Sequence, residues 1–391
     1  MKNAYILSAT RTGIGGFLGS LSPLSAIELG GKAIQSAIEK ANISREDIDE
    51  VILGNVLSAN LGQSPARQAA IYANIPHKAD ATTVNKVCSS GMKAITYGAQ
   101  SIFTGNSEVV ITGGMESMSN APYYINNHRM GTKTGHETFV DGMLKDGLWD
   151  PYFDFHMGNA AEMANLKYNI SREEQDEYTL QSFEKAAEAH QKGILDHERF
   201  AVTVPLRKGA LEYNTDEDVD KLKKEKVPHL SPIFEKEGSI TAANASNLND
   251  GAAALVLASE EYVQQHQLKP LAKIVAFADA AQSPEWFTTS PALSMAKALK
   301  IANMNVSEID YFEINEAYAN VPIINSRLLN IDINKVNVHG GAVAIGHPLG
   351  ASGARIVATL LNVLQTKGGR YGLAGICNGG GGSSALLIEK L

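Results

Sequence analysis

The sequence predicts an α/β protein made of two similar βα halves with a segment inserted between them. An internal repeat is the first reason, because AIQSAIEKANISREDIDEVILGN near the start resembles AKALKIANMNVSEIDYFEINEA near the end. In this alignment Ile48-Asp49 matches Ile309-Asp310. Further along each copy, EVVITGGMES and YGLAGICNGG both have the pattern of a buried strand that ends in glycines. We therefore expect two related halves that pack together.

A change in residue composition between the two copies is the second reason. From about Asn120 to Asn247 the chain is polar, aromatic and charged, and it contains the Lys-rich run DKLKKEKVPHL. After this region GAAALVLAS and AKIVAFADA resume the apolar strand pattern of the first part. We divide the chain into an N-terminal core half at 1–119, an inserted loop domain at 120–247 and a C-terminal core half at 248–391.

Helix and strand signals place the elements in order. The segment RTGIGGFLGS superficially resembles a dinucleotide-binding fingerprint, but its third glycine, Gly19, comes one residue late and no acidic ribose contact follows, so a turn is expected. The other expected elements are an opening strand at 4–9, a helix at 26–41, a capped link into a buried strand at 43–56, helices at 66–75 and 171–193, and strands at 107–119, 251–259 and 272–280.

Composition limits the function classes. The 391 residues are 44% hydrophobic and 19% charged, which is typical of a globular protein with room for two or three domains. A net charge of −8 argues against a nucleic-acid-binding surface, and no apolar run is long enough to span a membrane. The apolar part of the opening MKNAYILSATRTGIGGF is too short for a secretory signal. We therefore expect a reducing, cytoplasmic location.

The segment VNKVCSSGMKAITYGAQSIF places Cys88 between an extended approach and a helix. Ser89 and Ser90 suit a helix start, and a helix N-terminus favours the reactive thiolate. The alternative, a buried thiol acting as a small apolar residue, has similar weight for one cysteine alone. The only other cysteine, Cys377, lies in an equally glycine-rich segment, YGLAGICNGGGGSSALLIEKL. Two cysteines in such contexts favour a chemical role.

Three further segments carry groups that suit acyl chemistry. Asn315 ends a strand pattern in FEINEAYA, His347 lies between glycines in AIGHPLGASGAR, and the glycines Gly379 to Gly382 could aim backbone N–H groups at one point. Each has a structural alternative: a helix cap, a structural histidine and a flexible loop. One cysteine with a distant His and Asn would also suit a papain-type hydrolase, but that class does not explain the second cysteine.

At this point the sequence resembles the thiolase family over essentially its whole length. The motifs that carry the resemblance are VNKVCSSGMKAI, GGMESMS, HMGNAAE, NASNLNDGAAA, NEAYA, GGAVAIGHPLGASGAR and CNGGGG. Within the family, AFADAA, FTTSP and the ending CNGGGGSSALLIEKL are most similar to the acetoacetyl-CoA branch. The resemblance implies a layered αβαβα fold and a reversible Claisen condensation of two acetyl-CoA molecules to acetoacetyl-CoA and CoA.

The resemblance also implies a role for each of these groups. Cys88 would carry the acetyl group in a ping-pong reaction, His347 would take its thiol proton, and Cys377 would act as acid and base on the second substrate. His347 and a water held by Asn315 would form one oxyanion hole, and the backbone N–H groups of Cys88 and Gly379 the other.

Binding of the substrates acetyl-CoA, acetoacetyl-CoA and CoA is implied for the inserted region and its surroundings. The residues expected there are Leu148, His156 and Met157 at the pantetheine and thioester, Ser246 at the pantetheine, Phe287 at the acyl group and Lys226 at the CoA phosphates. No membrane or nucleic-acid partner is expected. Family members are usually dimers of dimers, so we expect a homotetramer with contacts at 123–143.

Two departures from the family pattern bear on specificity and on ions. The chain has FTTSP where many members have Met-Gly-x-Gly-Pro, so a degradative 3-ketoacyl-CoA thiolase of broader chain length is an alternative function. A non-catalytic CoA- or lipid-binding module on the same fold is a further alternative. No metal or cofactor is expected. Potassium is not expected either, because Phe183 stands where the potassium-activated branch has a tyrosine, although carbonyl groups remain available at Ala242, Ala243, Ala245 and Val343.

Overall fold

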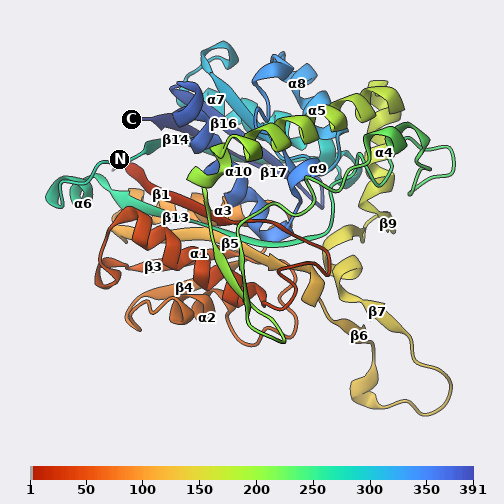
Figure 1. Ribbon diagram of the computed structural model, residues 1–391, viewed down its shortest axis with the longest axis horizontal. Coiled ribbons are helices and arrows are strands. Elements are labelled where there is room, and N and C mark those ends of the chain that lie inside the picture. The colour runs from red at the N-terminus through yellow and green to blue at the C-terminus, as the bar shows by residue number, and fades with distance from the viewer. Residues whose placement is uncertain (1–2) are drawn as a thin grey trace.

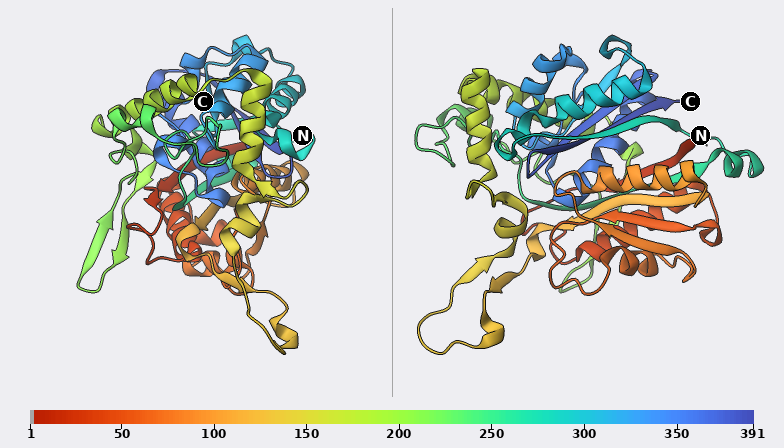
Figure 2. Two further views of the ribbon diagram at one scale, coloured as in Figure 1. Left: turned by 90° about the vertical axis from the view of Figure 1, so that its right-hand side faces the viewer. Right: turned by 180° about the vertical axis from the view of Figure 1, so that it is seen from behind.

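Two layers of strands, separated and flanked by helices, make up the computed structural model, which describes residues 3–391 (Figure 1). The strands form one hydrogen-bonded path in the order β15-β16-β17-β14-β1-β13-β5-β3-β4. The path divides between β1 (Ala4–Thr12) and β14 (Ala272–Ala281), which share only the pairs Tyr5↔Lys273 and Ile6↔Ala272. In the right-hand view of Figure 2 the two layers of strands lie one above the other.

The N-terminal layer has helices on its outer face and a mixed sheet. Its other strands are β3 (Glu50–Gly54), β4 (Asp80–Val84), β5 (Val109–Ser117) and β13 (Asn249–Ser259), with β2 (Gly15–Gly16) paired to β13. The helices α1 (Ala26–Ala41) and α2 (Pro65–Tyr72) pack on it through one apolar cluster. Ser25 and Glu28 form a capping box at the start of α1, which explains why the expected helix bounds match the observed ones.

The C-terminal layer repeats this plan. It contains β14, β15 (Tyr311–Ile314), β16 (Tyr371–Asn378) and β17 (Gly382–Lys390), and its outer face is covered by α7 (Ser290–Ala302) and α8 (Asn320–Leu329). The short helices η1 (Arg45–Asp47) and η8 (Val306–Glu308) hold equivalent positions in the two halves, each between a helix and the next strand. The other short helices are α6 (Glu260–Gln265), η7 (Pro284–Thr289) and η9 (Ile333–Lys335).

Two buried helices, α3 (Ser90–Thr104) and α10 (Leu349–Lys367), fill the space between the layers. Their apolar side chains share one core cluster with strands of both layers, and every residue of α10 from Leu349 to Leu364 is buried. The order helix, sheet, helix, sheet, helix confirms the predicted αβαβα fold.

The repeat alignment of Ile48-Asp49 with Ile309-Asp310 is visible as equivalent hydrogen bonds. Asp49 accepts from the backbone N–H of Val109 at the start of β5, and Asp310 accepts from that of Tyr371 at the start of β16. In each half the strand after the aspartate pairs in parallel with the strand that the aspartate holds.

The expectation that both strands end in their glycines is wrong for the first half. Gly113 and Gly114 lie inside β5, and a Cβ on Gly114 would come within 2.0 Å of the Gly350 carbonyl oxygen. Glycine is therefore required there because α10 starts directly against the strand. In the second half the strand β16 does end before Gly380 and Gly381, which have φ of +81° and +78°.

The segment between β5 and β13 surrounds one end of the layers (Figure 1). It contains η2 (Met118–Asn120), β6 (Tyr123–Ile125), η3 (His128–Met130), β7 (Phe139–Asp141), η4 (Leu144–Leu148), β8 (Trp149–Asp150), β9 (Phe155–His156), α4 (Met157–Tyr168), α5 (Arg172–Gln191), η5 (Ile194–His197), β10 (Arg199–Phe200), β11 (Val202–Pro205), β12 (Ala210–Tyr213) and η6 (Lys224–His229).

This segment is joined to the N-terminal layer by a parallel pairing of β10 with β1. The sheet also places β13 beside β5 and β1, although our division at residue 247 assigned it to the C-terminal half. The domain boundaries themselves stay a prediction. Within residues 3–391, no helix combines the length and apolar character needed to cross a membrane.

Candidate active site

A cavity of about 320 Å³ opens where α3, α10 and β16 meet the inserted segment. Cys88, His347 and Gly379 line it together with five of the six residues expected at the ligand. The remaining lining is mostly apolar: Met118, Leu144, Gly147, Ile233, Phe234, Ala242, Ala245, Asn247, Leu248, Ala317, Tyr318 and Leu349. The structure thus brings together groups from both halves and from the insert.

Cys88 lies half-buried in the turn between β4 and α3. Neither following serine caps the helix as expected, because Ser89 makes no side-chain cap hydrogen bond. The Ser89 hydroxyl instead lies 3.2 Å from the Ile376 carbonyl oxygen and 2.9 Å from Asn378 Oδ1. Ser89 therefore ties the Cys88 turn of one half to strand β16 of the other, on both sides of Cys377.

The thiol of Cys88 is neutral in the resting site, contrary to our expectation of a thiolate bias. Burial raises its pKa to about 12, while the backbone N–H groups of Cys88 and Gly379 act in the opposite direction. The helix end and N–H groups do favour the thiolate, but desolvation outweighs them. A proton acceptor beside the sulfur is therefore needed.

His347 lines the same cavity and is held in a defined tautomer. Its Nδ1 lies 2.6 Å from Ser352 Oγ, and the Ser352 hydroxyl donates to the Pro348 carbonyl oxygen at 2.9 Å. Because the single hydroxyl proton is used there, Ser352 accepts from Nδ1–H, which leaves a lone pair on Nε2. Nε2 is buried and has no hydrogen-bond partner. Burial, together with the positive charge of Arg355, lowers the pKa of His347 to about 3, so the imidazole is neutral.

Asn315 follows strand β15 directly and is fully buried. Arg355 Nη2 lies 3.5 Å from its side-chain oxygen, so the amide nitrogen Nδ2 points the other way and has no partner. An unpaired buried N–H donor is costly unless a ligand or water uses it. Glu313 Oε2 lies 3.7 Å from Arg355 Nη1 in an ion pair, and both side chains are 1% exposed.

Cys377 lies on β16, is fully buried, and does not itself line the cavity. It packs in one apolar cluster with Met157, Phe287 and Tyr318, all of which do. Burial raises the pKa of the Cys377 thiol well above its usual range, and Cys88 raises it further whenever that thiol is ionised. The two thiols, about 290 positions apart in the sequence, therefore belong to one site.

The expected ligand-binding residues divide into two groups. His156, at the start of α4, stacks on Phe234 with ring centroids 4.6 Å apart, and its Nδ1 accepts from the Gly158 backbone N–H at 3.0 Å. Along with His156, the cavity is lined by Leu148, Met157, Ser246 and Phe287. Lys226, in contrast, lies exposed on η6 and does not line the cavity.

Comparison with known proteins identifies the family. The family model "Thiolase, N-terminal domain" matches residues 4–261, and "Thiolase, C-terminal domain" matches residues 268–390. The chain belongs to the thiolase family. This confirms the resemblance on which the predicted roles depend.

Relatives of this thiolase are similar over their whole length. Acetyl-CoA acetyltransferase 2 of Arabidopsis thaliana is 52% identical, with 100% of this chain and 98% of that protein covered. A cytosolic acetyl-CoA acetyltransferase of Gibberella zeae is 49% identical, with coverage of 99% and 98%. The crystal structure of the Acat5 thiolase from Ascaris suum in complex with coenzyme A is 44% identical, with a TM-score of 0.94 and complete coverage of both chains.

Three residues of this thiolase site escaped sequence reasoning. Ser352 fixes the His347 tautomer, Phe234 stacks on His156, and Tyr318 lies between Phe234 and Phe287 in edge-to-face contacts. A signal existed only for Ser352, since side chains in the first turns of a helix point back toward its N-terminus. The other two contacts join segments far apart in the chain.

Proposed function

We propose that the chain is an acetyl-CoA C-acetyltransferase that condenses two acetyl-CoA molecules reversibly to acetoacetyl-CoA and CoA. The observation that carries the proposal is geometric: Cys88 and His347 line one cavity, and Cys377 packs against Met157, Phe287 and Tyr318, which line the same cavity. A hydrolase needs one nucleophilic thiol, whereas a condensation needs a second acid-base group for the α-carbon.

In the first half-reaction the Cys88 sulfur bonds to the acetyl carbonyl carbon and the CoA sulfur leaves. The thiol proton passes through His347 Nε2 to the departing CoA thiolate. We assign the charged oxygen to the backbone N–H groups of Cys88 and Gly379, an assignment supported by the action of both groups on the Cys88 sulfur.

In the second half-reaction the Cys377 thiol gives its proton to His347 Nε2, and the resulting thiolate takes an α-proton from a new acetyl-CoA. The α-carbon of that acetyl-CoA bonds to the acetyl carbon on Cys88, the bond from that carbon to sulfur breaks, and His347 Nε2–H returns its proton to the Cys88 sulfur. We assign the unpaired Asn315 Nδ2, through a water, and the protonated His347 Nε2 to the thioester oxygen during this step.

The test has two measurements. Mass spectrometry after mixing with acetyl-CoA should find acetylated Cys88, and thiolysis of 3-ketoacyl-CoA substrates should be confined to the four-carbon compound. Thiolysis that rises with chain length would instead support a broader 3-ketoacyl-CoA thiolase. No acetylation would support a non-catalytic binding module, and thioester hydrolysis without acceptor CoA would support a cysteine hydrolase.

We further propose a cytoplasmic homotetramer, with the hairpin β6–β7 as a contact between dimers. The hairpin extends away from the rest of the molecule (Figure 1), and Tyr123, Met130 and Phe139 are 62%, 86% and 66% exposed. Replacing Tyr123 and Phe139 with serine should convert tetramers to dimers in analytical ultracentrifugation. A wild-type mass of one or two chains would contradict the proposal.

Catalysis is proposed to need no resident cofactor, potassium included. Phe183 is buried at 6% exposure and offers no hydroxyl ligand. Activity in potassium-free sodium buffer should equal activity with added potassium chloride at the same ionic strength. For CoA phosphates, Lys226 remains a candidate contact, and Lys226→Ala should raise the KM for acetyl-CoA without changing kcat.

A further inference from the structure

The turn that presents Cys88 contains a strained residue. Val87, directly before the cysteine, has φ of +47°, a conformation that a β-branched side chain rarely adopts. Backbone strain of this kind persists only where the surrounding structure fixes it. The contacts of the turn should therefore reveal what holds it.

Within the turn, backbone and serine hydrogen bonds close the chain on itself. The Lys86 backbone N–H donates to Ser90 Oγ at 2.8 Å, and the Ser90 hydroxyl donates to the Val87 carbonyl oxygen at 2.6 Å. The Val87 N–H donates to Asn85 Oδ1 at 3.0 Å. These bonds shape the turn but do not connect it to the other half of the molecule.

Ser89 connects the turn to β16, and Lys86 connects it to β14 and β17. Its ammonium group donates to Asp279 Oδ1 at 2.6 Å, to Ser384 Oγ at 2.8 Å and to the Ser383 carbonyl oxygen at 3.0 Å. Asp279 belongs to β14, within the AFADAA motif, and pairs with Ser384 of β17. All three donor protons of the lysine are thus used by the C-terminal layer.

Asp279 is a firm anchor for this lysine. It accepts from Lys93 of α3 at 2.6 Å through its second oxygen and from the Ser384 hydroxyl at 2.6 Å. Burial alone would raise its pKa, but the bonds from Lys86, Lys93 and Ser384 hold it at about 2. The side chains of Lys86 and Asp279 are 25% and 36% exposed, so the pair is partly shielded from water.

We propose that Lys86 and Asp279 are positioning residues for the acyl-carrying thiol. Their ion pair holds the strained Val87 turn against β14 and β17, and so fixes Cys88 of one half opposite Gly379 of the other. The inference rests on the proposed role of Cys88. Lys86 acts through geometry, because burial, backbone N–H groups and Glu116, and not Lys86, account for the shifted pKa of Cys88.

The experiment measures single-turnover acetylation of Cys88 in the full chain, with Lys86→Met and Asp279→Asn as two independent variants. Each should lower the maximal acetylation rate constant about tenfold, the size expected when one left-handed non-glycine residue can relax. The acetyl-CoA concentration for half-maximal rate should not change, and the double variant should lose no more than either single one. Circular dichroism and melting curves confirm that each variant is folded.

Lys93→Met is the matched control, because Lys93 pairs with the same carboxylate but lies beyond the turn. It should lower the rate constant less than about threefold. A further test repeats Lys86→Met in a chain that carries Val87→Gly, since glycine adopts positive φ without strain. In that background Lys86→Met should lose less than about threefold, because no strain remains to be released.

The proposal is overturned if Lys86→Met and Asp279→Asn acetylate at the wild-type rate, if Lys93→Met matches Lys86→Met, or if the Lys86→Met loss is unchanged in the Val87→Gly background. A wild-type chain that does not acetylate would refute the proposed function instead. In that case iodoacetamide alkylation of Cys88, followed by peptide mass spectrometry, tests the positioning role with the same variants and the same ratios.

Discussion

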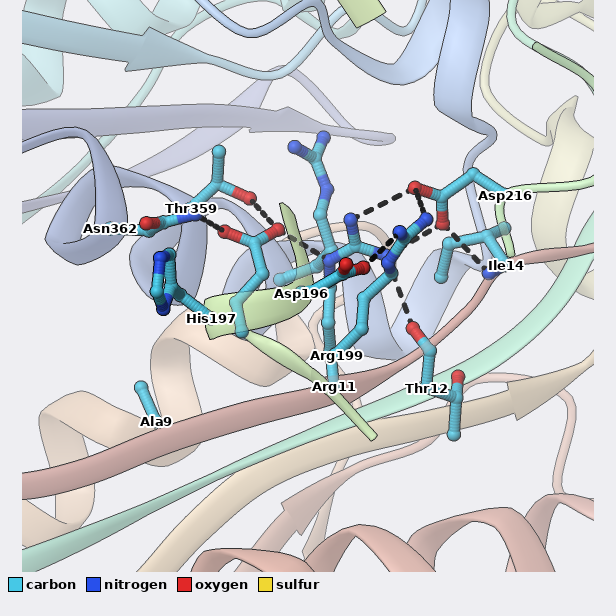
Figure 3. A network of polar contacts seen from close by, with 12 residues as sticks. Ala9, Arg11, Thr12, Ile14, Asp196, His197, Arg199, Asp216, Thr359 and Asn362 are labelled. Carbon is cyan, nitrogen blue, oxygen red and sulfur yellow. Dashed lines mark hydrogen bonds and ion pairs between the residues drawn. The ribbon is translucent and has the colours of Figure 1, made fainter. Parts of the chain in front are cut away.

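Two buried polar regions lie along helix α10. In the first the carboxylates are fully hydrogen-bonded, although Asn362 Oδ1 and Arg199 Nε there have no partner, and in the second a ring nitrogen and an amide nitrogen are unpaired. The first region lies beside the C-terminal half of the helix. There Arg11 is fully buried between Glu198 and Asp216, and its charged hydrogen bonds measure 2.6 to 3.0 Å (Figure 3). Thr359 and Asn362 of α10 donate to the two oxygens of Glu198. At the N-terminal end, His347 Nε2 and Asn315 Nδ2 have no partner.

This contrast distinguishes groups that stabilise the fold from groups that are available to a substrate. Both oxygens of Asp216 and of Glu198 accept hydrogen bonds, and this network joins the inserted segment to β1. Saturated groups have nothing left to offer a substrate. The unpaired atoms of His347 and Asn315 are available, because a substrate oxygen or a water can form the hydrogen bonds that they lack. We expect changes in the first region to affect stability and changes in the second to affect rate.

The largest effect is expected for Cys377→Ala. Turnover should fall by about 10²–10⁴, the range for loss of an acid-base group, while acetylation of Cys88 in a single turnover continues. Steady-state condensation and mass spectrometry of Cys88 measure the two steps. Equal loss of both steps would contradict the division of labour between the thiols. The free energy of unfolding should fall by about 0.5–1.5 kcal/mol, the range for deletion of one buried atom group from an apolar cluster.

Arg11→Met should give the converse result. It leaves Glu198 and Asp216 buried without their cation, which should lower the free energy of unfolding by about 3–5 kcal/mol. Denaturant unfolding measures this loss, and kcat per folded molecule should stay at the wild-type value. The control Arg370→Met removes an exposed pair with Glu389 and should leave the unfolding midpoint unchanged. A fall in kcat with unchanged stability would break the comparison.

Asn315→Ala tests the unpaired amide directly. Loss of one oxyanion donor should lower kcat by about 10²–10³. The free energy of unfolding should fall by no more than about 1 kcal/mol, because Nδ2 has no partner and the bond from Arg355 Nη2 to Oδ1 is long, at 3.5 Å. Asn325→Ala is the matched control: that buried amide accepts from the Ala292 N–H and donates to the Thr288 and Val321 carbonyls, each at 2.7 Å. Asn325→Ala should lower stability by about 1–3 kcal/mol and leave kcat unchanged.

The same contrast explains what the sequence could predict. Local signals placed the repeat, the capping box of α1 and the glycine-flanked groups Cys88, His347 and Cys377. The ion pair of Arg11 with Glu198 joins residues that are 187 positions apart in the sequence, and no local sequence pattern predicts it. The raised pKa of Cys88 likewise depends on tertiary burial. Gly114 was placed at a strand end because only the packed α10 shows why a glycine must lie inside β5.

Ser352→Ala should give the smallest effect, and it lies on the border between the two regions. The hydroxyl of Ser352, like that of Thr359, is hydrogen-bonded, but its partner is His347, a candidate catalytic residue. Without it Nδ1–H loses its acceptor, and the other tautomer would place a proton on Nε2, where it cannot accept one from Cys88. The acetylation rate should fall about tenfold, equal to about 1.4 kcal/mol, and the free energy of unfolding by about 1 kcal/mol. Ser352→Thr keeps the hydroxyl and should restore the rate. A loss of stability alone would place Ser352 with the structural network and remove the tautomer argument.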